Sequence, residues 1–267
     1  MVKQIQYALA RAFMKTVGQL SDGIRLCYQE GLTSGKMLDY IYQNRPAGKC
    51  LIGRLLDQRF LSDPGWEAVR IRRRHLEQLI IKAINELKSQ NRAVSLLDIA
   101  SGPGAYVLSV ISQVGEEGLS ARCRDFEQRW VAEGQASADK MGLKNVTFEH
   151  GDAFNRDEVM NLQPRPNLAI ASGFYDWFNE DDKVQQSIDI VFAAIENGGY
   201  FVLSNQCAHP KLEFTEQVFT DFNKQPLRMT MRSKEKIHAM LQNAGFEIEE
   251  TLADENNYYS VTKARKP

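Results

Sequence analysis

The chain has 267 residues, of which 43% are hydrophobic and 25% charged, and its formal net charge is −1. This length allows one large domain, or one core with a smaller cap. Its mean hydropathy is −0.40, and no run of about 18 apolar residues occurs, so we expect no membrane-spanning helix. The N-terminus lacks the apolar block of a secretory signal, and the four scattered cysteines form no Cys-x-x-Cys pair. We therefore expect no metal site or disulfide framework, and a cytoplasmic location.

The charge is unevenly distributed. Residues 1–75 carry 13 Lys/Arg against 6 Asp/Glu, so the remainder is net acidic. Two interpretations stay open: the N-terminal part meets something anionic, or the two parts of the chain attract each other.

Up to about residue 89 the pattern is helical. Apolar residues at helix-like spacings open the chain, namely Ile5, Leu9, Ala12, Phe13 and Val17. Glycines at 18, 23, 31 and 35 then divide the segment into short helices. The turn Ser62–Gly65 predicts the start of a long amphipathic helix over Trp66–Lys88. We interpret residues 1–90 as a helical cap, or lid, that closes over the rest of the chain.

After Asn91 the hydrophobic period changes to that of alternating strands and helices. The predicted strands are Ser95–Ala100, Ala121–Asp125, Val146–His150, Leu168–Ser172, Tyr200–Asn205, Phe246–Ala253 and Tyr258–Lys263. The predicted helices are Tyr106–Val114, Glu127–Met141, Asp181–Glu196 and Ser233–Asn243. Such alternation predicts a mostly parallel α/β sheet. The last two strands are joined by only a few residues, so they should pair antiparallel. Residues 91–267 are thus predicted to form a Rossmann-like domain.

The first predicted strand leads into a glycine turn. Asp98 ends the strand, and the turn comprises Ala100, Gly102, Pro103 and Gly104. Glycines at such a turn let backbone amides approach a nucleotide-like ligand closely. Asp98 and the turn residues are therefore candidate ligand contacts.

The next two strands end in acidic residues as well. Asp125 follows Gly104 by about 21 residues, where a carboxylate accepts ribose hydroxyls, and the adjacent Phe126 could cover an adenine face. Asp152, with Ala153 and Phe154, follows the third strand, where a carboxylate accepts from the adenine amine. A dinucleotide site does not need this third contact, so the pattern favours an adenosyl group.

With Ser172–Tyr175 after the fourth strand, these elements resemble class I S-adenosylmethionine-dependent methyltransferases. Further segments along nearly the whole chain resemble one bacterial methyltransferase family, whose members occur alone or fused to α/β-hydrolase domains in settings that suggest lipid metabolism. Those segments are Ser21–Arg25, Thr33–Tyr42, Gly65-Trp66, Arg70-x-Arg72 and Gln206–Glu213. The resemblance implies a Rossmann-like class I methyltransferase sheet with an N-terminal helical cap, and S-adenosyl-L-methionine as cofactor.

The remaining candidate residues concern the methyl group and its acceptor. His209, after the fifth strand, is the candidate base; the alternative is that it fixes the turn at Pro210. Arg72 could bind the cofactor's methionine carboxylate, and Tyr175 could cover the cofactor. Four residues are candidate acceptor contacts: Tyr40, Tyr42, Asp176 and Gln206. Of the two tyrosines Tyr40 and Tyr42, which point to different faces of a helix, at most one should line the site, and core packing is the alternative. For Asp176 and Tyr175 the alternative is ordinary loop chemistry.

The sequence favours transfer of a methyl group to oxygen or nitrogen of a small or amphipathic acceptor, either a lipid or a secondary metabolite. The rival is a non-catalytic adenosyl-ligand-binding module whose cap contacts a partner. An RNA methyltransferase is the least supported alternative: there is no Asn/Asp-Pro-Pro-aromatic signature and no Pro-Cys dipeptide after the fourth strand, and no RNA-binding module. Peripheral membrane contact is compatible with the sequence, which leaves the oligomeric state open.

Overall fold

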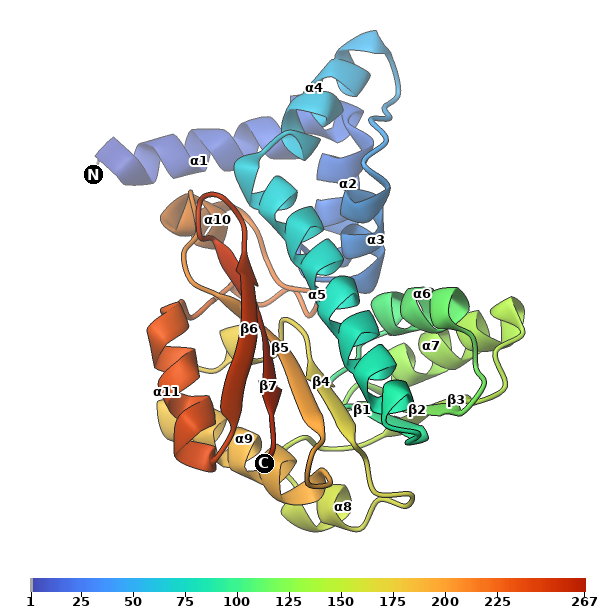
Figure 1. Cartoon of the computed structure of the whole chain (residues 1–267). Helices are drawn as coiled ribbons and strands as arrows, with labels where there is room; N and C mark the ends of the chain where they lie inside the picture. The colour runs from blue at the N-terminus through green and yellow to red at the C-terminus, as the bar shows by residue number, and fades with distance from the viewer. Residues whose placement is uncertain (1) are drawn as a thin grey trace. The chain divides into compact units, whose positions relative to one another are not determined.

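The computed structural model describes residues 2–267, and its contacts divide the chain into two compact units (Figure 1). The helical unit comprises the chain up to Ile71 together with His209–Met229. The sheet unit comprises Arg72–Ala208 and Thr230–Pro267.

The sheet unit contains seven strands in the order β3-β2-β1-β4-β5-β7-β6. The strands are β1 (Val94–Asp98), β2 (Leu119–Asp125), β3 (Val146–His150), β4 (Leu168–Ala171), β5 (Tyr200–Gln206), β6 (Glu247–Ala253) and β7 (Tyr259–Arg265). The first five are mutually parallel, whereas β7 pairs antiparallel with both β5 and β6. The predicted mostly parallel sheet and the closing antiparallel hairpin are therefore confirmed.

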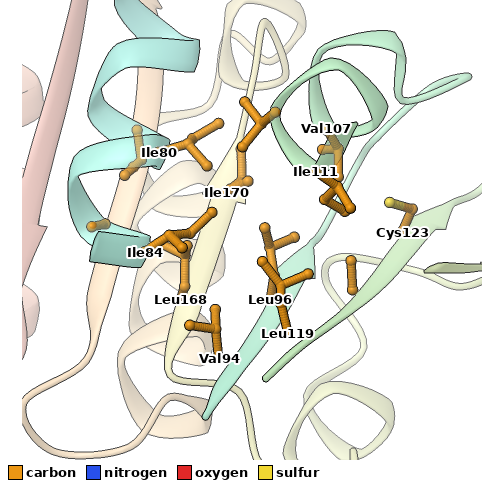
Figure 2. Packing of buried hydrophobic residues seen from close by; sticks show 14 of the residues in the cluster. Ile80, Ile84, Val94, Leu96, Val107, Ile111, Leu119, Cys123, Leu168 and Ile170 are labelled. Carbon is orange, nitrogen blue, oxygen red and sulfur yellow. The ribbon is translucent and has the colours of Figure 1, made fainter. Parts of the chain in front are cut away.

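Helices cover both faces of this sheet. They are α5 (Pro64–Ser89), α6 (Ala105–Val114), α7 (Gln128–Met141), α8 (Arg156–Met160), α9 (Asp181–Ala194) and α11 (Lys234–Ala244), with a short 3₁₀ turn η2 (Tyr175–Trp177). On one face, Ile80 and Ile84 of α5 and Val107 of α6 pack on Leu96 and Ile170 (Figure 2). On the other face, α9 and α11 bury a second apolar cluster. Alternate strand residues thus point to opposite layers, as the period of a β-strand requires.

The helical unit is built from short helices: α1 (Val2–Lys15), η1 (Val17–Leu20), α2 (Asp22–Glu30), α3 (Gly35–Gln43), α4 (Leu51–Leu61), the start of α5, and α10 (Leu212–Val218). Ser21 and Ser34 cap α2 and α3 by accepting bonds from the backbone N–H of Ile24 and Met37. Such caps satisfy amides that a helix start leaves without partners.

The boundary between the units differs from the predicted division at residue 90. The C-terminal part of α5 belongs to the sheet unit, because Leu76, Ile80 and Leu87 are buried in its core. Conversely, residues 209–229 belong to the helical unit, where Phe214 of α10 packs edge-on against Tyr7 of α1. This second segment is far away in the sequence, so local patterns did not indicate it.

Within residues 2–267, no helix combines the length and the apolar content that crossing a lipid bilayer requires.

Candidate functional site

The glycine turn after β1 has an open side. Gly102 has φ +55°, and a Cβ there would meet no atom within 4 Å. Gly104 differs, because a Cβ there would lie 2.7 Å from the Phe148 ring. Only the glycine at 102 thus leaves room for a ligand against the backbone, whereas the glycine at 104 lets α6 pack closely on the sheet. Ala100 and Pro103, on either side of Gly102, are half-buried.

Asp98, at the carboxyl end of β1, is fully buried. Its carboxylate accepts bonds from the Tyr106 hydroxyl and, at 3.3 Å, from the Ala100 N–H. Burial raises the pKa of Asp98 to about 7, although these two hydrogen bonds oppose the shift. Through these two hydrogen bonds the Asp98 carboxylate holds the glycine turn and the start of α6 in place.

Asp125, at the end of β2, faces the same turn. One carboxylate oxygen accepts the Gly102 N–H at 2.8 Å and the other accepts the Glu127 N–H at 2.9 Å. Burial raises the pKa of Asp125. Each oxygen keeps a further lone pair, so the carboxylate is oriented by the backbone and can still accept ligand hydroxyls. The next residue, Phe126, is 67% exposed, so its ring is accessible to a flat ligand.

The loop after β3 carries Asp152, Ala153 and Phe154. One oxygen of the half-buried Asp152 carboxylate accepts the Phe154 N–H at 2.9 Å, and Ala153 is buried. The Phe154 ring packs against Phe174 and Phe178 with centroids 5.5 and 4.9 Å away. Phe154 therefore belongs to an aromatic cluster beside the candidate site. The second carboxylate oxygen of Asp152 can accept a hydrogen bond from a ligand.

The sequence analysis missed the group that holds this loop. The buried Arg124 guanidinium pairs with Glu158 at 2.5 Å, and Glu158 also accepts the Asp152 N–H at 3.2 Å. A Cβ on Gly151 would lie 2.2 Å from Arg124 Nη2, so a side chain there would displace that guanidinium. The alternation along β2 was the available signal, since Arg124 precedes Asp125 and points to the opposite face.

The carboxyl ends of β4 and β5 bring further predicted residues together. Ser172 follows β4 and is half-buried. The adjacent Gly173 donates its N–H to Ser204 of β5 at 2.8 Å. The predicted Arg72 is buried: its guanidinium lies 4.9 Å from the Tyr259 ring centroid, and a Cβ on Gly173 would lie 3.0 Å from its Nη1. Arg72 thus supplies positive charge at this edge of the sheet.

Asp176 and Gln206 lie at the same edge. The buried Asp176 carboxylate accepts the Gln206 N–H at 2.9 Å. Burial raises the pKa of Asp176 to about 6, while this hydrogen bond and the charges of Arg72 and Arg232 oppose the shift. Arg232, which sequence reasoning missed, is itself buried and donates to the Tyr175 carbonyl at 2.8 Å and to Asp181 at 2.9 Å. The cluster holds a carboxyl group whose proton equilibrium lies near neutral pH.

Tyr175 is a core residue rather than a cover for a ligand. Its side chain is fully buried in the cluster beneath α9, and its hydroxyl lies 3.2 Å from Ser187 Oγ. Burial raises the pKa of Tyr175. The 3₁₀ turn η2 directs this ring inward, so the exposed aromatic candidates are those on neighbouring loops.

The other three predicted residues belong to the helical unit. His209 Nδ1 accepts the Lys211 N–H at 3.0 Å, and burial lowers the pKa of His209. A neutral ring in this state carries its proton on Nε2, so it donates there and has no free lone pair. Tyr40 donates its hydroxyl to Asp57, and Tyr42 is half-buried.

Asp57 was not anticipated from the sequence. It is fully buried and accepts four bonds, two at each oxygen. The donors are Ser21 Oγ, the Gly23 N–H, the Tyr40 hydroxyl and the Ala47 N–H. One carboxylate therefore joins α2, α3, α4 and the loop before α4.

A family model described as "Putative methyltransferase" matches residues 1–266. The chain belongs to this methyltransferase family. A curated relative, "Uncharacterized protein YnbC" of Escherichia coli (strain K12), is 38% identical over 263 residues, which are 97% of this chain. The methyltransferase chain spans 45% of the length of that relative.

Solved structures show the fold of this methyltransferase family member. A protein of Bordetella parapertussis, titled a possible exported protein, superposes with a TM-score of 0.72 at 17% identity, covering 100% of this chain and 88% of that one. Magnesium protoporphyrin IX methyltransferase of Synechocystis PCC 6803, solved with bound SAH, superposes with a TM-score of 0.58 at 14% identity. The match covers 90% of this chain and 98% of that one. The predicted Rossmann-like class I methyltransferase fold is thereby confirmed.

Proposed function

We propose that this chain transfers a methyl group from S-adenosylmethionine to oxygen or nitrogen of a small or amphipathic acceptor, a lipid or a secondary metabolite. One observation carries the proposal: Asp98 and Asp125 end β1 and β2, Asp152 follows β3, and these three strands are neighbours in the sheet, with the open backbone at Gly102 bonded to Asp125. In open α/β sheets, ligands bind at the carboxyl ends of the strands.

The residues fit the cofactor group by group. The Asp125 carboxylate is half-buried and held by two backbone N–H groups, which suits bidentate acceptance of ribose hydroxyls. Asp152 has an oxygen that can accept from the adenine amine, and Phe126 offers an exposed ring. Arg72 supplies the positive charge that a methionine carboxylate needs. The cofactor, when bound, supplies an activated methyl group, so the protein mainly orients the reactants and excludes water.

The acceptor needs a base only if its reacting atom is protonated. Asp176 is one candidate, because it is buried in the η2 turn after β4 with a pKa of about 6 and so exists largely as a carboxylate at neutral pH. His209 is the candidate predicted from the sequence, and in this role it would have to give up the bond from the Lys211 N–H. Gln206 is proposed to hold the acceptor beside Asp176.

Titration calorimetry with S-adenosylhomocysteine tests the cofactor assignment. We expect binding, and we expect Asp125→Ala to weaken it at least several-fold because charge-assisted hydrogen bonds are lost. Asp182→Ala, at an exposed position in the first turn of α9, is the control and should bind as the parent does. Binding of NADH in place of S-adenosylhomocysteine would refute the assignment.

An S-adenosylhomocysteine-release assay over fatty acids, phenols and amines then tests catalysis. Loss of the base should lower kcat by about 10²–10⁴-fold without changing cofactor affinity. If Asp176→Asn has this effect, Asp176 is the base. If His209→Ala has it, His209 is; a lower melting temperature with unchanged kcat would mean that His209 only fixes its turn. Cofactor binding without turnover of any acceptor would favour the non-catalytic module.

A further inference from the structure

The first two turns of α4 carry the three exposed apolar side chains that we call the α4 tip: Leu51, Ile52 and Leu55. They are 75%, 61% and 57% exposed, whereas the opposite side of the helix is buried at Gly53 and Asp57. Leaving three such side chains in water is unfavourable by the hydrophobic effect. The α4 tip therefore presents an apolar surface that nothing in its own unit covers.

Cations surround this tip. Arg45 and Lys49 precede α4, Arg54 and Arg59 lie within it, and all four are exposed. Among the described residues, none of these four side chains pairs with an acidic group. The single acid between residues 43 and 62 is Asp57, which is buried and already accepts four hydrogen bonds. The surface around the tip is accordingly rich in cations, and Asp22, whose N–H donates to the Ala47 carbonyl, is itself paired with Arg25 at 2.8 Å.

The exposed stripe of α1 lacks this arrangement. Leu9 is 65% exposed there, but of the three cations of α1, only Lys15 has no partner among the described residues. Lys3 pairs with Glu213 at 2.8 Å, and Arg11 donates to the Gln217 carbonyl at 2.7 Å. Four unengaged cations thus lie beside the exposed apolar side chains of α4, whereas α1 has one, Lys15.

We infer that the α4 tip docks on the surface of an anionic phospholipid bilayer. The apolar side chains would enter the boundary between headgroups and acyl chains while the cations meet lipid phosphates. Charge complementarity selects this occupant. Three side chains also fall short of the ~20–30 residues per side of a stable protein interface. The inference does not depend on the methyl-transfer proposal.

Flotation of the full chain with vesicles tests the inference. At about 0.15 M salt, where screening is strong, we expect binding to equimolar phosphatidylcholine and phosphatidylglycerol and none to phosphatidylcholine alone. Lys49→Gln with Arg54→Gln should weaken binding roughly 30-fold, from about tenfold per 1.4 kcal/mol and ~1 kcal/mol per cation. Leu51→Ser with Leu55→Ser should weaken it by about 10-fold or more. Leu9→Ser on α1 is the matched control and should bind as the parent chain does.

A second measurement locates the contact. Cys50 is exposed at the start of α4, whereas Cys27 and Cys123 are buried. An environment-sensitive thiol dye on Cys50, in a Cys207→Ser background, should shift to the blue with the anionic vesicles only. Circular dichroism should show unchanged folding of all variants, since the replaced side chains are exposed.

Three results would overturn the inference. The first is no binding to the anionic vesicles. The second is equal binding by the parent chain and both α4 variants, or loss of binding by Leu9→Ser. The third is a dimer in sedimentation velocity that Leu51→Ser with Leu55→Ser converts to a monomer, because a second copy would then cover the tip.

Discussion

Replacement of Gly102 by alanine should affect ligand binding and the stability of the chain for two different reasons. At φ +55° an alanine occupies the left-handed region, which costs about 1–2 kcal/mol, but its Cβ would meet no atom within 4 Å. For a chain of this size we expect a melting temperature lower by roughly 2–8 °C, at about 2–4 °C per kcal/mol. The N–H that Asp125 accepts is retained, so the carboxylate keeps its orientation.

In the proposed site, the same methyl group would occupy the space where the cofactor meets the backbone. We therefore expect Gly102→Ala to weaken S-adenosylhomocysteine binding by about 10-fold or more, equivalent to ~1.4 kcal/mol, in titration calorimetry. Gly115→Ala is the matched control: Gly115 has φ +74° and equally open surroundings, but it follows α6 at the other end of the helix. It should destabilise the chain similarly and leave binding unchanged. Equal affinities for both variants would refute the assignment of the ligand to this turn.

Three further predictions concern buried groups. Asp57→Ala leaves four donors without their acceptor, at about 1–3 kcal/mol each, so residues 21–61 should lose protection in hydrogen exchange; unchanged protection would contradict the role of this carboxylate. The pKa of Asp98 is about 7 in the folded chain, against an ordinary value of 3.8 in the unfolded chain. The folded state therefore holds a proton that the unfolded state releases. The free energy of unfolding should thus fall as pH rises from about 4 to 7, by at most ~1.4 kcal/mol per pH unit; Asp98→Asn should flatten this slope in urea titrations, and parallel curves would speak against it. Burial raises the pKa of the Cys27 and Cys123 thiols, so a thiol reagent should modify Cys50 first, and rapid reaction of either buried thiol in the native chain would argue against the core packing.

The strands of the sheet were predictable because each is a short buried segment bounded by turn residues. β3 (Val146–His150) has the predicted bounds, and the others differ by one or two residues at their ends. α8 and α10 were missed for a physical reason. With five and seven residues, they are too short to show the helical period.

The positions of the candidate site residues were predictable only where a strand end fixes them. Asp98 and Asp125 follow directly from the ends of β1 and β2. Tyr175 shows the limit of this reasoning, because an aromatic residue after a strand can turn toward the crevice or into the core, and the η2 turn decides which. Arg124 with Glu158 depends on contacts between separate elements, which no local periodicity encodes.

The helical unit consists of two segments that lie far apart in the sequence, so its parts are synthesised at different times. The N–H of Leu32 donates to the Thr220 carbonyl at 2.9 Å, and Tyr28 donates to the Val218 carbonyl at 3.1 Å. Roughly 140 residues of the sheet unit are translated between these partners, which takes about 7–30 s at ~5–20 residues per second. During this interval the N-terminal helices have left the ribosome while Tyr7 and the groups that contact α10 remain in water. The helical unit of a nascent chain can therefore close only after residues 209–229 have been made.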